Sequence, residues 1–123
     1  MNNPAETPRL RLRIVFADGS WMGPGKADLL ERIRETGSIA AAGRTMSMSY
    51  KRAWMLVETM NRAFRDPLVD STRGGAKGGG ARLTEAGETV LANYRKLEEI
   101  MAEAGAARIG TLRSMLRDIP EQK

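Results

Sequence analysis

Residues 36–84 read TGSIAAAGRTMSMSYKRAWMLVETMNRAFRDPLVDSTRGGAKGGGARLT. This stretch predicts a short helix, a tight turn, a longer basic helix and then a glycine-rich hairpin. The first helix should begin after Ser38 and end near Met46, and the second should span residues 50 to 64 or 65. A protein needs these elements in this order to place one helix in the major groove of DNA and a loop over the adjoining backbone.

Small residues dominate the first of these helices, which contains Ala40-Ala41-Ala42-Gly43. Glycine in a helix interior costs about 1 kcal/mol relative to alanine, so we predict that another helix approaches closely at Gly43. Ser47 or Ser49 can cap the second helix. The apolar stripe of the second helix includes Trp54, which we assign to the core.

The first turns of the second helix combine a hydroxyl, an aromatic ring and two cations. An ordinary surface helix with a few cations is the alternative, but the first turn is the part of a recognition helix that contacts base edges. The predicted base-reading residues are Ser49, Tyr50, Lys51, Arg52 and Met55.

The glycine-rich segment lies between two strand-like runs, residues 68–72 and 81–83. A flexible linker is one alternative. A phosphate-binding nucleotide loop is another, but the glycines lack the GxxxxGK[ST] spacing and precede a strand rather than a helix. The segment carries only positive charge, with no acidic residue between Asp70 and Glu85. We therefore predict a wing that contacts the DNA backbone through Arg73, Lys77 and Arg82.

The flanking segments predict a hairpin on one side and a long helix on the other. Residues 9–16 alternate apolar side chains with arginines, which indicates a half-buried strand whose arginines face solvent or, less simply, a phosphate. Asp18-Gly19 predicts the turn to a short partner strand. A helix should follow from about Lys26 to Thr36, with Gly37 as its stop.

Thr84 should cap the long helix, whose apolar residues recur at spacings of three and four in a narrow seam. The seam could be intramolecular core, but a helix of this length favours a dimer. The predicted seam residues are Val90, Tyr94, Leu97 and Met101. The predicted organisation is a lead-in at residues 1–8, a domain at 9–104 with its dimer helix at 84–104, and a short amphipathic helix and tail at 105–123.

Length and charge agree with one nucleic-acid-binding domain. The chain has 123 residues, with 14 basic and 8 acidic side chains in residues 1–82 and 6 and 7 in the remainder. The positive field thus surrounds the predicted helix pair and wing, and a polyanion is the natural partner.

Several function classes are disfavoured by composition. The sequence has no Cys and no His, which excludes disulfides, zinc fingers, thiol nucleophiles and imidazole bases. No carboxylate pair or nucleophile–base set stands out, so we do not expect an enzyme. No apolar run has the roughly 20 residues of a membrane span, and MNNPAETPR is not a signal peptide, so we expect a soluble, cytoplasmic protein without a membrane partner.

A family resemblance rests on residues 37–42, GSIAAA, residues 48–54, MSYKRAW, the PLV at 67–69, the glycine wing, and RLTEAG at 82–87. Together with the hairpin ending MGPGK at 22–26, these closely resemble the N-terminal DNA-binding domain of molybdenum-responsive, ModE-type transcriptional regulators. More loosely, the chain is similar to the winged helix of LysR-type regulators. The match covers roughly residues 9 to 104.

The resemblance implies a mainly α fold with small β, a winged helix-turn-helix with an N-terminal β-hairpin and a long C-terminal helix. It implies a positioning helix from Ser38 to Met46, with Ser38 among the DNA contacts, and a wing from Arg73 to Arg82. It also implies a homodimer on double-stranded DNA at a pseudo-palindromic operator of molybdenum-related genes. Gly43 and Ser47 replace the usual Ala and Gly of the motif, which predicts strain at Ser47.

Regulators of this type continue into a molybdate-binding domain that has no counterpart in this sequence. We therefore expect neither molybdate binding nor any other cofactor on this chain. The alternative function is a protein-interaction module, for example a heterodimer partner of a longer, sensor-bearing regulator.

Overall fold

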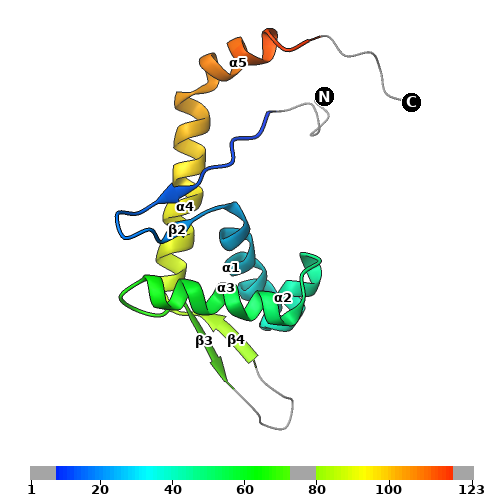
Figure 1. Cartoon of the computed structure of the whole chain (residues 1–123), viewed down its shortest axis with the longest axis vertical. Helices are drawn as coiled ribbons and strands as arrows, with labels where there is room; N and C mark the ends of the chain where they lie inside the picture. Colours follow the sequence, from blue (N-terminus) through cyan, green and yellow to red (C-terminus); the bar gives the residue numbers. More distant parts are fainter. Residues whose placement is uncertain (1–7, 73–79, 118–123) are drawn as a thin grey trace, which may run out of the picture.

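The computed structural model describes residues 8–72 and 80–117, which form a mainly helical fold with two small antiparallel hairpins (Figure 1). The elements in chain order are β1 (Ile14–Val15), β2 (Trp21–Met22), α1 (Pro24–Thr36), α2 (Ile39–Thr45), α3 (Tyr50–Ala63), β3 (Val69–Thr72), β4 (Gly80–Leu83), α4 (Glu85–Ala104) and α5 (Ala106–Ser114). The predicted fold class is confirmed. The predicted lead-in, except residue 8, and the end of the predicted tail lie outside the described residues.

The hydrophobic core forms where α1, α2, α3 and the first half of α4 meet. Each helix supplies buried side chains at helical spacing, so one stripe of each faces inward. The fully buried side chains include Leu29, Leu30, Ile33, Val57, Met60, Leu68, Leu91 and Tyr94. This core fixes α3 with one face inward and the other free.

The helix boundaries follow the predicted capping residues. Gly37 ends α1 in the left-handed conformation with φ 72°, which glycine adopts without steric cost. The hydroxyls of Ser38, Ser49 and Thr84 accept hydrogen bonds from backbone N–H groups in the first turns of α2, α3 and α4. Of the two serines predicted as possible caps of α3, Ser49 is the cap.

The N-terminal segment differs from its prediction in strand length. The alternation predicted a strand over residues 9–16, but only Ile14 and Val15 pair, with Met22 and Trp21 respectively. The reason is that β2 is only two residues long, so the preceding residues have no partner strand. Solvent exposure still alternates along these residues: the arginines are exposed and the intervening leucines are partly buried.

Helix α1 begins earlier than predicted, at Pro24 rather than near Lys26. Proline is well suited to the first helical position because its fixed φ is helical and its missing N–H has no partner there. Lys26 is only 2% exposed, and its ammonium donates to the Trp21 carbonyl at 3.1 Å and lies 3.7 Å from the centre of the Trp21 ring. Arg13 stacks on the same ring at 4.0 Å. Burial, together with the Arg13 charge, lowers the pKa of Lys26.

Arg95 of α4 ties that helix to α1. Its guanidinium donates to Asp28 at 2.8 Å and to Glu31 at 2.6 Å, both on α1, and to Glu98 at 3.1 Å on its own helix. Burial alone would lower the pKa of Arg95, but the three carboxylate hydrogen bonds outweigh it and raise the pKa above its usual range. The base of α4 is thus fastened to the helical head by charge as well as by packing.

The second half of α4 extends away from the head, and α5 lies at its far end (Figure 1). No residue of α5 is buried. None of the helices in the described ranges is long and apolar enough to cross a bilayer.

Candidate nucleic-acid interface

Helices α2 and α3 form a helix-turn-helix pair held by a close backbone approach. A Cβ atom built on Gly43 would lie 3.0 Å from the Cβ of Ala53 and 3.4 Å from Met48. The predicted close approach at Gly43 is therefore present, and it explains a glycine inside α2. The turn between the helices places Ser47 at φ 58°, the left-handed conformation that costs a non-glycine residue about 1–2 kcal/mol. The strain predicted at Ser47 is present.

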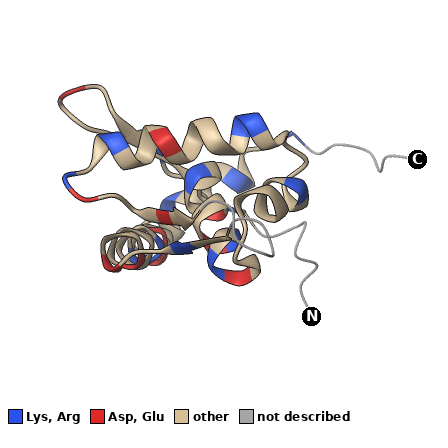
Figure 2. Cartoon of the chain, turned by 90° about the horizontal axis from the view of Figure 1, so that it is seen from below, with Lys and Arg blue, Asp and Glu red and all other residues tan. Residues whose placement is uncertain are grey.

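Helix α3 presents an exposed face opposite its buried stripe. Ala53, Val57 and Met60 are at most 1% exposed, whereas Tyr50 is 55% and Met55 57% exposed. Cationic residues lie toward both ends of α3, with its single acidic residue, Glu58, between them (Figure 2). The N-terminal half of this face is free to enter a groove.

Asn61 joins α3 to the strand that follows it. Its side-chain oxygen accepts from the backbone N–H groups of Leu68 at 2.8 Å and Val69 at 3.1 Å, and its amide nitrogen donates to the Val69 carbonyl at 3.1 Å. Leu68 and Val69, at the start of β3, are both buried. Asn61 thus fixes β3 against one side of α3, and we call this the wing side of the helix.

Strands β3 and β4 form the base of the predicted wing. Their register pairs Val69 with Leu83 and Asp70 with Arg82. Arg82 is exposed, and its guanidinium lies 3.7 Å from the Asp70 carboxylate. The charge of Arg82 is therefore partly balanced by Asp70. The sequence did not predict this ion pair, because it depends on the register of β3 against β4. Arg73 and Lys77 lie outside the described residues.

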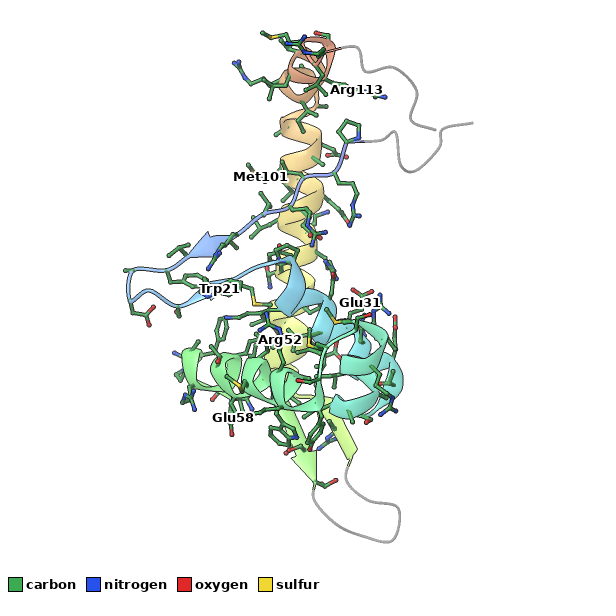
Figure 3. The ribbon with its side chains drawn as sticks, turned by 45° about the vertical axis from the view of Figure 1, so that its right-hand side comes forward. Trp21, Glu31, Arg52, Glu58, Met101 and Arg113 are labelled. Carbon is green, nitrogen blue, oxygen red and sulfur yellow. The ribbon has the colours of Figure 1, made fainter. Side chains whose placement is uncertain are left out.

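The predicted base-reading residues do not all lie together. Tyr50, Lys51 and Met55 line a shallow groove along the N-terminal half of α3. Arg52 is exposed on another side of the helix from Glu58 (Figure 3). The Ser49 hydroxyl accepts from the Arg52 N–H at 3.1 Å, which leaves its hydrogen as the group available to a ligand. Ser38 is similar, accepting from the Ala41 N–H at 3.0 Å.

The same groove contains two residues that the sequence reasoning did not assign to it, Trp54 and Glu58. Trp54 was assigned to the core, but it is only partly buried: one side packs on the core and the other faces the groove. Its four-residue spacing from Tyr50 was the available signal, because residues so spaced lie on one side of a helix. The rings meet edge to face, with centroids 6.2 Å apart.

The predicted dimer seam divides into a covered part and a free part. Tyr94 is 2% exposed, and its hydroxyl donates to the Leu12 carbonyl at 2.6 Å. It therefore belongs to the intramolecular core, the alternative left open by the sequence, because the N-terminal segment covers it. Val90 is also partly buried. Leu97 is 38% and Met101 44% exposed, so the free part begins at Leu97.

The helix pair with its following two-stranded hairpin defines this protein as a winged helix-turn-helix protein. Residues 26–88 match the model of the bacterial regulatory helix-turn-helix proteins of the lysR family. The chain belongs to this family.

Individual curated proteins are also similar to this chain. The chain is 43% identical over 93 residues to the molybdenum-pterin-binding protein MopA of Rhodobacter capsulatus, covering 76% of this chain and 35% of that protein. It is 36% identical over 90 residues to the DNA-binding transcriptional dual regulator ModE of Escherichia coli K12, covering 73% and 32%. The chain thus spans about a third of the length of the curated relatives it matches, and it corresponds to their N-terminal part.

The fold also recurs among solved structures. The DNA-binding domain of CbnR, solved in complex with DNA, superimposes with a TM-score of 0.56 at 18% identity, covering 72% of this chain and 95% of that one. At this identity the likeness concerns the fold.

Proposed function

We propose that this chain is a sequence-specific, DNA-binding transcriptional regulator that inserts the N-terminal half of α3 into the major groove. The observation that carries the proposal is the geometry of α3: its exposed, cationic first turns lie free while Asn61 fixes the base of a basic wing beside them. Membership of a family of regulatory helix-turn-helix proteins supports it.

In this proposal the residues divide by role. Tyr50, Lys51 and Met55 contact base edges, and Ser49 and Arg52 lie close enough in the first turn to contribute. Ser38, Arg73, Lys77 and Arg82 contact the phosphate backbone. The organisation proposed is one DNA-binding domain over residues 9–104, followed by a short helix and tail.

We further propose that the chain binds a pseudo-palindromic operator as a homodimer. The support is a strip of apolar side chains that the head leaves uncovered along α4, α5 and the two residues after α5. Its members are Leu97, Ile100, Met101, Leu112, Met115 and Leu116, each at least 38% exposed. The similarity to ModE and MopA supports genes of molybdenum metabolism as the targets.

DNA binding is tested by fluorescence anisotropy with promoter fragments at two salt concentrations. Lys77→Ala should weaken binding to all sequences about equally and flatten the salt slope by roughly one unit, because a phosphate contact carries no base information. Lys96→Ala, an exposed lysine on α4, is the matched control and should change neither. Equal affinity for every sequence would refute specific regulation.

The dimer is tested separately by analytical ultracentrifugation. Met101→Glu should shift the chain toward monomer, since it places a charge in the apolar strip, whereas Ala102→Glu should not, because the exposed Ala102 lies on the side of α4 away from Leu97 and Ile100. A monomeric wild-type chain that binds no DNA would favour the second candidate, a heterodimer partner of a longer regulator. The same apolar strip is the observation in favour of that candidate.

A further inference from the structure

The groove on the wing side of α3 has a composition unusual for a DNA-contacting surface. It is an open groove of about 400 Å³ and is lined by Tyr50, Lys51, Trp54, Met55 and Glu58. Two aromatic rings and a thioether provide most of its wall, although the helix lies in a basic part of the chain. Such a lining suits a small apolar group carried by a polyanion.

The hydrogen bonding within the groove leaves the Tyr50 hydroxyl hydrogen available as a donor. The Trp54 Nε1–H donates to the Tyr50 hydroxyl oxygen. A phenol that accepts in this way keeps its own hydrogen for another partner, and accepting a bond strengthens it as a donor. The groove therefore offers an apolar wall and, at its Tyr50 end, a hydroxyl donor.

We propose that this groove reads a thymine, with the C5 methyl group against Trp54 and Met55 and the O4 atom accepting from the Tyr50 hydroxyl. The inference rests on the proposed DNA-binding function and extends it to a base. In the major groove thymine alone presents a methyl group beside an acceptor, whereas cytosine presents an amino donor there.

Charge in the groove disfavours one competing base, guanine. Lys51 brings a positive charge to the groove, while the Glu58 carboxylate is exposed and only loosely paired with Arg62 at 4.0 Å. A guanine would bring two acceptors, O6 and N7, toward that carboxylate, which is unfavourable. Thymine brings one acceptor, O4, and the Tyr50 hydroxyl can donate a hydrogen bond to it.

The test uses deoxyuridine, which keeps O4 and removes only the methyl group. The probe is the duplex most enriched by the wild-type chain from a random library, resynthesised with each thymine in turn replaced by deoxyuridine. We expect about a fourfold loss of affinity at one position per half-site, the value of one buried methyl group, and little change elsewhere.

Protein variants then assign the methyl effect to the groove. Met55 is 57% exposed, so Met55→Ala should fold, and in it the deoxyuridine effect should fall below about twofold. Val15→Ala, the matched control at an exposed apolar residue of β1, should keep the fourfold effect. Tyr50→Phe should reduce the preference for thymine over cytosine at the same position.

The outcomes separate this inference from the proposed function. Sequence-specific binding in which no thymine is sensitive to deoxyuridine overturns the thymine assignment and leaves the regulator intact. A deoxyuridine effect that is unchanged in Met55→Ala would also overturn the thymine assignment and leave the regulator intact. Failure of the library to enrich any sequence overturns both.

Discussion

Asn61 offers the sharpest test of how the wing is attached to the recognition helix. Asn61→Ala removes three hydrogen bonds and leaves the backbone N–H groups of Leu68 and Val69 without an acceptor. These residues are 0% and 4% exposed, so water cannot readily replace the lost oxygen. A buried donor left unsatisfied costs about 1–3 kcal/mol, which gives about 2–6 kcal/mol for the two donors. That is a large part of the about 5–15 kcal/mol that stabilises a typical domain.

The assay is urea unfolding followed by tryptophan fluorescence and far-ultraviolet circular dichroism. Asn61→Asp keeps an acceptor for both N–H groups and loses only the donation to Val69, so it should cost about 1 kcal/mol. Asn93→Ala removes an exposed amide that binds only the Thr89 carbonyl of its own helix and should change stability by less than about 0.5 kcal/mol. Asn61→Ala and Asn93→Ala of equal stability would refute the reasoning.

Three further predictions concern the backbone and one buried charge. Gly87→Ala would place its Cβ in steric conflict with the Leu68 carbonyl oxygen and should lose about 1–3 kcal/mol in urea unfolding, while Gly110→Ala, with open space around it, should lose none; equal stabilities would contradict this. Ser47→Gly should gain about 0.5–1 kcal/mol in the same assay by relieving the left-handed conformation, and a loss would argue against strain there. Because burial lowers the pKa of Lys26, the unfolded chain holds that proton more tightly than the folded one. The stability of wild type relative to Lys26→Met should therefore rise as the pH increases toward the ordinary value of 10.5, and a flat difference would contradict the lowered pKa.

The helical part of the fold could be predicted because its signals are local. Ser38, Ser49 and Thr84 cap helices through atoms only three residues away. The length of β1 could not be predicted, since an alternating pattern does not show where a partner strand ends. Helical spacing likewise identified an apolar seam on α4 but not that the N-terminal segment covers Tyr94.

The sequence predicted where on α3 the candidate site lies better than it predicted which side chains line the groove. The first turns of α3 are exposed, and their contact with DNA stays a prediction. Which residues line the groove depends on the direction in which each side chain leaves the helix. Tyr50 and Met55 point toward the groove, whereas Arg52 lies on another side of α3 (Figure 3). The half-exposed Trp54 was assigned to the core because an apolar stripe does not show where the core stops.

The Arg95 cluster has a mechanical consequence for a protein that reads two half-sites. Because Arg95 of α4 binds two carboxylates of α1, each protomer of the proposed α4-paired dimer should be rigid, and the distance between the two recognition helices should be fixed. One added base pair between half-sites turns one of them by about 35° around the duplex. A rigid dimer should therefore bind weakly to an operator with one added base pair between its half-sites. Arg95→Met removes the ion pairs between α4 and α1, so this variant should bind the lengthened operator with a smaller loss of affinity in a series of spacer lengths.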